Sequence, residues 1–398
     1  MSAQPAPASA PEPVPSDDAR ILVVDDLRSS RMLIGSVLKS AGFSNIDYAG
    51  DGIEALERFE AHEPDIILLD IVMPRMDGFE VSHAIRNRFD SDVPILVQSG
   101  VQEAEQRVRA FDMGATDLVS KPINAGELIS RLRLHIERRR LIARLKRYQK
   151  RMDEELHTAE GMQMSLMKEA PEVDAITYPR QARMETFYRP SYKLGGDLWD
   201  VFEIDEHRFG VLMVDLSGHG VSAAINAFRL HMLAERSEAD AGDPGAWLAR
   251  LSDELYEILP IEHFATAFYG VFDKRDLSLT FAGAGAPTPV LRRHDGSVEH
   301  LDASGLIMGC RSGGQYGNQR IALQPGDRLC LYSDALYENF DTPDGALSVD
   351  ELSALIVATM EGEVREGFTT DLIQRVFGSM PESFPDDLTI LMLEVIQP

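Results

Sequence analysis

Short apolar runs alternate with helical patterns over residues 20–125. Four runs have the composition of buried strands, because they are rich in Ile, Leu and Val and stop at acidic or turn residues: RILVVDD, DIILLDIVMP, VPILVQSG and ATDLVSKP. Between the first two, SSRMLIGSVLKSAG carries apolar residues at helical spacing and stops at Gly42. This alternation predicts an α/β doubly wound domain, in which reactive side chains gather at the carboxyl ends of parallel strands.

Residues 126–172 carry a heptad pattern instead. The stretch from Glu127 to Leu166 contains no proline and a single glycine, and its apolar residues recur every seven positions, with interruptions at Arg138 and Glu155. The two apolar heptad positions hold Leu134, Leu141, Tyr148 and Met162, and Leu145, Met152, Ala159 and Leu166. The stripe predicts a helical coiled-coil linker that makes the protein a homodimer. The alternative is an amphipathic helix packed on its own domain, but about 40 helical residues span roughly 60 Å, too far to bury on one small domain.

Strand patterns dominate residues 173–398. The β-rich runs are FGVLMVDLSG, TAFYGVFD, LSLTFAGAGAP, RLCLYSDA and DLTILMLEVI, and helical patterns cover VSAAINAFRLHMLAERSE and SVDELSALIVATM. This mixture predicts an α+β domain with a β-sandwich flanked by helices. The chain is therefore expected to be multidomain, with residues 1–19, which are rich in Pro and Ala, as a disordered leader.

Charge and composition exclude several classes of function. The net charge of −26 and the pI near 4.7 argue against nucleic acid and against an anionic membrane surface as partners. No apolar run approaches the roughly 20 residues of a membrane span, and the first residues lack the pattern of a signal peptide. The two cysteines, Cys310 and Cys330, belong to no metal-binding pattern and are expected to be buried thiols. A cytoplasmic location fits these features.

Acidic, hydroxyl and basic side chains stand at the ends of the four strands predicted in residues 20–125. Asp25 and Asp26 end the first strand, Asp70 the second, Ser99 the third and Lys121 the fourth. Adjacent carboxylates with a third nearby suit a hard cation such as Mg²⁺. A carboxylate beside that cation can attack a phosphoryl donor and become an aspartyl phosphate. The lysine would neutralise the new charge, and the serine would donate a hydrogen bond to it.

This set, with MPRMDG after Asp70, resembles the response-regulator receiver domain, whose fold is flavodoxin-like. The resemblance implies that a sensor histidine kinase or a phosphotransfer protein phosphorylates Asp70. The implied sites are Asp25, Asp26, Asp70 and Val72 for Mg²⁺, and Ser99 and Lys121 for the switch. Leu118 stands where receivers usually carry Tyr or Phe, so the usual aromatic rotamer switch is not expected.

Separated acids also flank the strands predicted in residues 173–398. They lie in LGGDLWD, VLMVDLSGHG, RLCLYSD and DDLTILML: Asp197, Asp200, Asp215, Asp334, Asp386 and Asp387. Acids at strand ends can converge on a pair of divalent ions. Because no His or Cys ligand pattern accompanies them, Mg²⁺ or Mn²⁺ is favoured over zinc. Two such ions activate a water and hold a phosphate for in-line attack.

In order along residues 155–396, AEGMQMSL, LGGDLWD, VDLSGHGVSAA, FATAFYGVFD, LQPGDRLCLYSDALYE and DDLTILML resemble the metal-dependent (protein phosphatase 2C-like) phosphatases of the SpoIIE/RsbU-type sporulation and stress-regulator branch. The resemblance implies catalytic metal ligands at Asp197, Asp215, Asp334, Asp386 and the carbonyl of Leu216, with Asp200 and Asp387 orienting them. His219 is a candidate general acid or a turn histidine, and Arg189 or Lys193 is a candidate phosphate contact or a solvated base. The implied substrate is a phosphoserine or phosphothreonine of a STAS-type anti-sigma-factor antagonist.

Two motifs depart from this branch. Ala335 replaces the usual glycine after Asp334, which is costly only if the backbone there needs a positive φ. Gly283 and Ala286 replace an Asn and a His in AGAGAP. These departures motivate an alternative function, a non-catalytic adaptor that binds a sigma-factor pathway protein under receiver control. A DNA-binding regulator is disfavoured, since residues 173–398 show neither a basic face nor a helix-turn-helix pattern.

Overall fold

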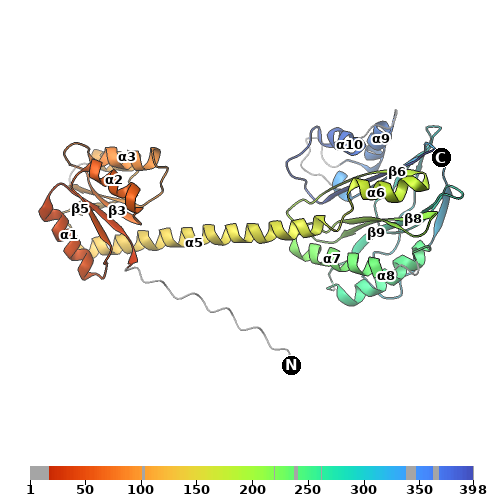
Figure 1. The fold of residues 1–398 in the computed structure, drawn as a ribbon, viewed down its shortest axis with the longest axis horizontal. Coiled ribbons are helices and arrows are strands. Elements are labelled where there is room, and N and C mark those ends of the chain that lie inside the picture. The colour runs from red at the N-terminus through yellow and green to blue at the C-terminus, as the bar shows by residue number, and fades with distance from the viewer. Residues whose placement is uncertain are drawn as a thin grey trace, which may run out of the picture. The chain divides into compact units, whose positions relative to one another are not determined.

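The computed structural model describes residues 18–100, 104–218, 220–236, 241–260, 262–337, 347–361 and 367–397. The chain divides into two compact units, Met1–Met152 and Asp153–Pro398 (Figure 1). Most of the predicted leader, residues 1–17, lies outside the described ranges.

The first unit is built on a five-stranded parallel sheet of order β2-β1-β3-β4-β5. Its strands are β1 (Ile21–Val24), β2 (Ile46–Ala49), β3 (Ile66–Asp70), β4 (Ile95–Gly100) and β5 (Asp117–Lys121). The predicted α/β class is confirmed, and β2 is the strand that the sequence reasoning missed. Its sequence, IDYA, is short and mostly half-buried at the edge of the sheet, so it lacks a long apolar run.

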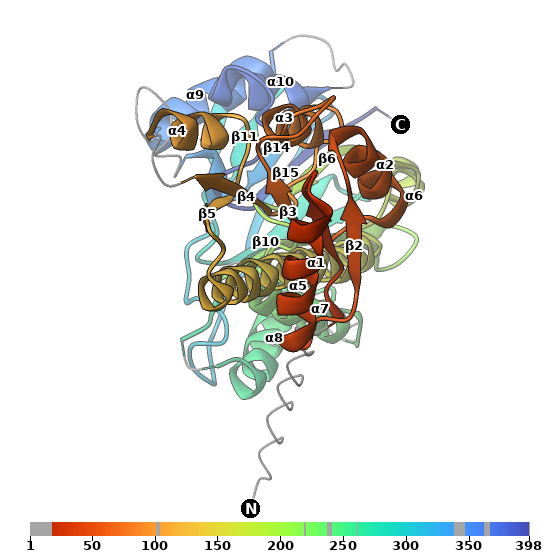
Figure 2. The ribbon, with the colours of Figure 1, turned by 90° about the vertical axis from the view of Figure 1, so that its left-hand side faces the viewer.

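Helices cover both faces of this sheet (Figure 2). They are α1 (Arg28–Ser40), α2 (Gly52–His62), α3 (Gly78–Asn87), α4 (Ala104–Asp112) and the first turns of α5 (Ala125–Met164). Side chains of α1 and α5, including Leu38 and Leu132, pack on one face, whereas α2, α3 and α4 supply Phe59, Ile85 and Ala110 to the core on the other. The packing of these helices on both faces holds in place the carboxyl edge of the sheet, where the predicted acids lie.

Helix α5 is continuous over 40 residues, which confirms a long helical linker. It ends at Met164, and a separate helix, α6 (Ala170–Thr177), follows. Further along α5 than the turns buried in the first unit, apolar side chains of the heptad stripe lie in solvent: Leu141 is 55% exposed, Leu145 58% and Tyr148 63%. These side chains gain nothing from the hydrophobic effect in a single chain.

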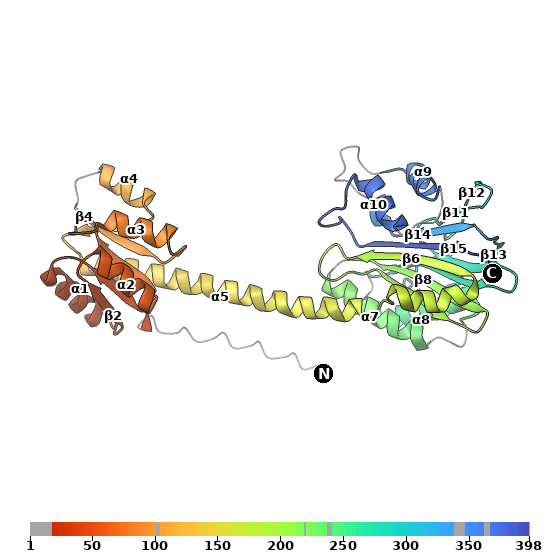
Figure 3. The ribbon, with the colours of Figure 1, turned by 45° about the horizontal axis from the view of Figure 1, so that its top comes forward.

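The second unit contains a sandwich of two five-stranded antiparallel sheets (Figure 3). One sheet has the order β13-β10-β9-β8-β7, and the other β12-β11-β14-β15-β6. The first comprises β7 (Leu198–Glu203), β8 (Arg208–Leu216), β9 (Ala265–Asp273), β10 (Ser278–Ala284) and β13 (Gln319–Ala322). The second comprises β6 (Ala182–Arg189), β11 (Val290–Arg292), β12 (Val298–His300), β14 (Arg328–Tyr332) and β15 (Leu388–Val395).

Helices cover the outer faces of both sheets. In Figure 3, α7 (Val221–Arg236) and α8 (Pro244–Ile258) lie below the sheet that holds β8, and α9 (Val349–Thr359) and α10 (Phe368–Phe377) lie above the one that holds β15. Buried Trp247 and Leu251 of α8 pack on the first sheet, and buried Ile356 and Leu372 pack on the second. The predicted β-sandwich flanked by helices is therefore confirmed.

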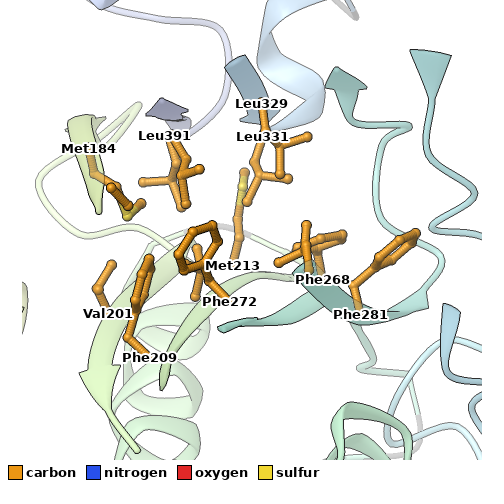
Figure 4. Close-up of a cluster of buried hydrophobic side chains, with 14 of the residues drawn as sticks. Met184, Val201, Phe209, Met213, Phe268, Phe272, Phe281, Leu329, Leu331 and Leu391 are labelled. Atoms are coloured by element: carbon orange, nitrogen blue, oxygen red, sulfur yellow. The ribbon is translucent and has the colours of Figure 1, made fainter. Parts of the chain in front are cut away.

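The core between the sheets joins residues that are far apart in the sequence. Met184 and Leu391 of one sheet face Phe209 and Phe272 of the other (Figure 4). Burial of such large apolar side chains stabilises the sandwich by roughly 1.5–3 kcal/mol for each of them. This core holds the ends of β8, β14 and β15 in place, and each of these strands ends beside a predicted metal-binding acid.

Two further expectations concern cysteines and membranes. Cys330 is buried as expected, but Cys310 is exposed, so the expectation that both thiols are buried was wrong. Cys310 lies in an irregular connection between β12 and β13, where an isolated thiol needs no apolar neighbours. Within the described part of the chain, none of the helices combines the length and apolar character that a membrane crossing needs.

Candidate metal centres

Three carboxylates meet at the carboxyl edge of the parallel sheet. Asp25 and Asp26 directly follow β1, and Asp70 is the last residue of β3. One ligand oxygen from each lies within 4.8 Å of the others, with Asp25 and Asp70 buried and Asp26 exposed. Two buried acids with an open side suit a hydrated Mg²⁺, which keeps several of its waters.

Lys121 is the countercharge of this carboxylate group. Its Nζ lies 2.5 Å from Asp70 Oδ2 and 3.5 Å from Asp25 Oδ2. Burial raises the pKa of Asp70, and the hydrogen bond from Lys121 opposes that rise. Ser99 is buried near the end of β4, beside the strand that carries Asp70. The Val72 side chain is exposed, and its backbone N–H is directed at the Asp70 carboxylate.

Arg31 is a residue of this centre that the sequence reasoning missed. Its Nη1 donates hydrogen bonds to the backbone oxygens of Asp25 and Asp26, at 2.5 and 3.1 Å. The Asp25 carboxylate in turn accepts hydrogen bonds from Ser30 Oγ at 2.7 Å and from the Leu27 N–H at 2.9 Å. The first turn of α1 thus fixes the two acids, and the available signal was a basic residue five positions after the acidic pair.

In the second unit, the predicted acids lie beside the ends of different strands. Asp197 precedes β7, and Asp215 is the last residue but one of β8. Asp334 opens a 3₁₀ turn after β14, and Asp386 lies two residues before β15. Burial raises the pKa of Asp215 to about 7, and repulsion by Asp334 and Asp386 adds to the rise. Burial also raises the pKa of Asp197 well above its ordinary value, with Asp215 contributing. The four acids therefore lie near enough for their charges to act on one another.

This centre is looser than the first. Among the residues that the structure describes, the acids of the first centre are the only group of three with ligand atoms within 4.8 Å of one another. Mutual repulsion between buried carboxylates is relieved by cations, and the donors are all oxygens, so the residues fit divalent ions. The Leu216 carbonyl faces the same loop, since a Cβ on Gly196 would lie 2.7 Å from its oxygen.

Asp387 organises the loop that carries Asp197. Its carboxylate accepts hydrogen bonds from the Gly196 N–H at 2.5 Å and from the Ser191 N–H at 2.7 Å. Thr389 Oγ1 donates to Asp197 Oδ2 at 2.6 Å. Thr389 was not singled out in the sequence, and its only signal is its place two residues after the acidic pair. Fixing a ligand by hydrogen bonds of this kind commonly sets metal affinity.

The other candidate side chains of the second unit have protein partners. Asp200 accepts a hydrogen bond from Lys168 Nζ at 2.5 Å, and Lys193 Nζ donates to Asp153 Oδ1 at 2.7 Å. Arg189 lies over the rings of Phe187 and Phe384 and donates to a backbone oxygen of Pro381. His219 lies outside the described residues.

The last turn of α5 is bound directly to the Asp197 loop. Buried Gln163 donates from Nε2 to the Gly195 carbonyl at 2.7 Å and accepts from the Gly195 N–H at 3.2 Å. The neighbouring Gly196 carries the hydrogen bond to Asp387. Gln163 lies in the AEGMQMSL motif but was given no role from the sequence. A movement of α5 would reach the backbone next to Asp197 through this pair of bonds.

The two departures from the phosphatase motifs are accommodated without strain. Ala335 is buried within the 3₁₀ turn Asp334–Leu336 and is not among the described residues with a positive φ, so a methyl group costs nothing in backbone conformation. At Gly283, a Cβ would collide with the backbone of Ala303, so an asparagine has no room there. The AGAGAP segment therefore requires the glycine at position 283, and each of the acids predicted to bind metal is present in the sequence.

The raised pKa of Asp215 predicts how metal binding depends on pH. Without ions, the protonated form stabilises the fold: this contribution is complete below the ordinary pKa near 4 and is lost as the pH rises through about 7. A cation competes with that proton. Because this competition is weaker at the higher pH, we expect Mn²⁺ to raise the melting temperature by several degrees more at pH 7.5 than at pH 5.5. A difference of about 1 kcal/mol in the free energy of unfolding corresponds to about 2–4 °C in a unit of this size. Differential scanning calorimetry with Mn²⁺ and with EDTA measures this, and equal shifts at both pH values would contradict it.

Comparison with known families supports the division into two kinds of domain. Residues 21–133 match the model of the response regulator receiver domain, and residues 205–396 match that of Stage II sporulation protein E (SpoIIE). The chain therefore joins a receiver domain to a SpoIIE-type phosphatase domain.

Individual relatives agree with this division. Response regulator MprA of Mycobacterium ulcerans is 41% identical over 122 residues, which make up 31% of this chain and 52% of that protein. The chain thus spans about half the length of such curated relatives. The SiaA-PP2C domain of Pseudomonas aeruginosa is 19% identical, with a TM-score of 0.53, over 62% of this chain and 98% of that one, which shows a shared fold. The RsbU and RsbW domains of Rv1364c from Mycobacterium tuberculosis align over 55% of this chain and 61% of that one, with 22% identity and a TM-score of 0.48.

Proposed function

We propose that the second unit is a protein serine/threonine phosphatase dependent on two Mn²⁺ or Mg²⁺ ions, and that phosphorylation of Asp70 controls it. The observation that carries this proposal is the convergence of Asp197, Asp215, Asp334 and Asp386 in one site, where burial and mutual repulsion raise the pKa of Asp197 and Asp215. A group of buried acids whose negative charges repel one another favours the binding of cations.

The residues divide the catalytic work between them. When bound, a pair of divalent ions activates water and holds the phosphate oxygens for in-line displacement. Asp215, whose charge is repelled by those of Asp334 and Asp386, would hold the ions together with the Leu216 carbonyl, Asp197, Asp334 and Asp386. Asp387 and Thr389 hold the Asp197 loop through the hydrogen bonds to Gly196 and to Asp197.

The proposed substrate is a phosphoserine or phosphothreonine on a STAS-type anti-sigma-factor antagonist. The resemblance of the motifs to the SpoIIE/RsbU branch supports this substrate class. Dephosphorylation would allow the antagonist to bind its anti-sigma partner and so release a sigma factor. The protein would then control transcription without contacting DNA, in keeping with its acidic charge.

Regulation is proposed to pass along α5. A sensor histidine kinase or a phosphotransfer protein phosphorylates Asp70, with Mg²⁺ held by Asp25, Asp26 and the carbonyl of Val72. The phosphoryl group changes the surface against which the first turns of α5 pack. The far end of the same helix reaches the Asp197 loop through Gln163, and Asp153 binds Lys193 in that loop. A switch requires such an element with two arrangements.

The exposed apolar stripe of α5 supports a homodimer formed through the linker. Leu141, Leu145 and Tyr148 are each more than half exposed in the single chain, and pairing two such helices would bury them. We expect the wild-type chain to sediment as a dimer and Leu145→Glu to shift it to a monomer, because a charge in the seam is desolvated without a partner. A matched Arg147→Glu substitution on the exposed side of the helix should leave the dimer intact. A monomeric wild type at micromolar concentration would contradict this expectation.

The alternative function is a non-catalytic adaptor that binds a sigma-factor pathway protein, and the altered AGAGAP sequence, with Gly283 and Ala286, is the observation that favours it. Phosphate release from a phosphoserine STAS-type protein, measured with Mn²⁺ and with EDTA, separates the two functions. Turnover that needs Mn²⁺ supports the phosphatase. Folded protein that binds the antagonist but releases no phosphate under either condition supports the adaptor.

A further inference from the structure

Tyr188, near the end of β6, has a buried hydroxyl with no hydrogen-bond partner among the residues that the structure describes. It is one of few such groups among the described residues. Leaving a buried hydroxyl unpaired is costly, and native proteins usually supply a partner, a water or an ion. Another buried tyrosine hydroxyl of the sandwich, that of Tyr269, follows this rule, since it donates to the Ala241 carbonyl at 2.7 Å.

The Tyr188 hydroxyl lies against the phosphatase metal centre. A Cβ placed on Gly195 would lie 2.5 Å from Tyr188 Oη and 2.5 Å from Asp387 Oδ2, so the two oxygens flank the same point of the loop. Burial raises the pKa of Tyr188 strongly, and the charges of Asp387 and then Asp197 raise it further. The phenol therefore stays protonated and offers a hydrogen-bond donor, not an anionic ligand.

We propose that Tyr188 is a positioning residue of the phosphatase metal centre, whose hydroxyl donates its hydrogen bond to an oxygen that enters with the divalent ions, from either water or phosphate. The inference rests on the proposed function. The acids nearest the hydroxyl already have partners: Asp387 is bound by Gly196 and Ser191, and Asp197 by Thr389. An oxygen that enters with the ions would supply the acceptor that the Tyr188 hydroxyl lacks.

The test compares Tyr188→Phe with the matched control Tyr269→Phe, each in the full chain. Without ions, Tyr188→Phe should melt at or above the wild-type temperature, because the substitution removes an unpaired hydroxyl. Tyr269→Phe should melt at a lower temperature, because it removes the hydrogen bond to the Ala241 carbonyl. The affinity for Mn²⁺, measured by calorimetry, should fall about three- to tenfold in Tyr188→Phe and remain unchanged in Tyr269→Phe. Binding by the receiver centre is subtracted with the Asp215→Ala variant.

Adding inorganic phosphate distinguishes the two sources of the oxygen. A loss of affinity with Mn²⁺ alone assigns the partner to water, and a loss seen only when phosphate is added assigns it to phosphate. Tyr188→Phe that binds Mn²⁺ as the wild type does, with and without phosphate, overturns the role of Tyr188 and leaves the metal centre standing. A wild-type chain that binds no more Mn²⁺ than Asp215→Ala overturns the metal centre itself, and this inference with it.

Discussion

Replacing Asp215 by Asn should abolish metal-dependent phosphate release, with a loss on the order of a thousandfold or more. The side chain is surrounded by Asp334, Asp386 and Asp197, and it is the acid on which repulsion from the others converges. Its removal would take away a proposed ligand of the ions. The charge stabilisation that such ions supply amounts to several kcal/mol, and each ~1.4 kcal/mol corresponds to a tenfold change in rate. Phosphate release in Mn²⁺, with the same protein–substrate pair for both proteins, measures the loss.

The matched control is Asp371→Asn, an exposed acid of α10. It removes the same charge from the same unit and should leave turnover at the wild-type rate. The melting temperature in EDTA provides a second comparison, because Asp215→Asn relieves repulsion in the ion-free site and should not destabilise the fold. Turnover retained in folded Asp215→Asn would mean that the acids do not hold the catalytic ions.

The patterns of the sequence predicted both folds where the patterns were strong. The buried runs that became β1, β3 and β4 are continuous and apolar, and the long runs of the sandwich are similar. The strand β2 was missed because a four-residue, half-buried edge strand carries too little apolar signal. Helix α5 was predicted from its heptads, but its end at Met164 was not, because no proline or glycine stands at that position.

Within the candidate metal centres, the sequence pointed to the acids better than to the residues that hold them in place. Acids at strand ends are visible as a pattern, so Asp70 and Asp215 could be chosen without a structure. Gln163 and Tyr188 are separated from the acids that they approach by many residues, and their spacing follows no period. Only the folded chain brings Gln163 to Gly195 and the Tyr188 hydroxyl to the Asp387 loop.

Beryllofluoride, a phosphoryl mimic, should raise phosphatase turnover about 5- to 150-fold, the range of ordinary coupling free energies, and Asp70→Asn should remove that response completely. Asp70 is buried beside Asp25 and Lys121. A phosphoryl group on Asp70 would take the place of the Asp70 carboxylate as the acceptor of the hydrogen bond from Lys121 Nζ. Asparagine keeps the shape of the side chain but cannot accept the mimic. Turnover is measured in Mg²⁺ and Mn²⁺ with and without beryllofluoride, and Asp112→Asn, an exposed acid of α4, is the matched control.

A second variant tests whether the signal travels through α5. Gln163→Ala removes both hydrogen bonds to Gly195 but leaves every proposed ligand in place. It should bind beryllofluoride at the receiver as the wild type does, yet show a much smaller change in turnover, because the helix no longer holds the Asp197 loop. If Gln163→Ala retains the full response, the linker acts through other contacts, of which the bond between Asp153 and Lys193 is the next to break. If Asp70→Asn retains it, beryllofluoride acts outside the receiver, and control by Asp70 is wrong.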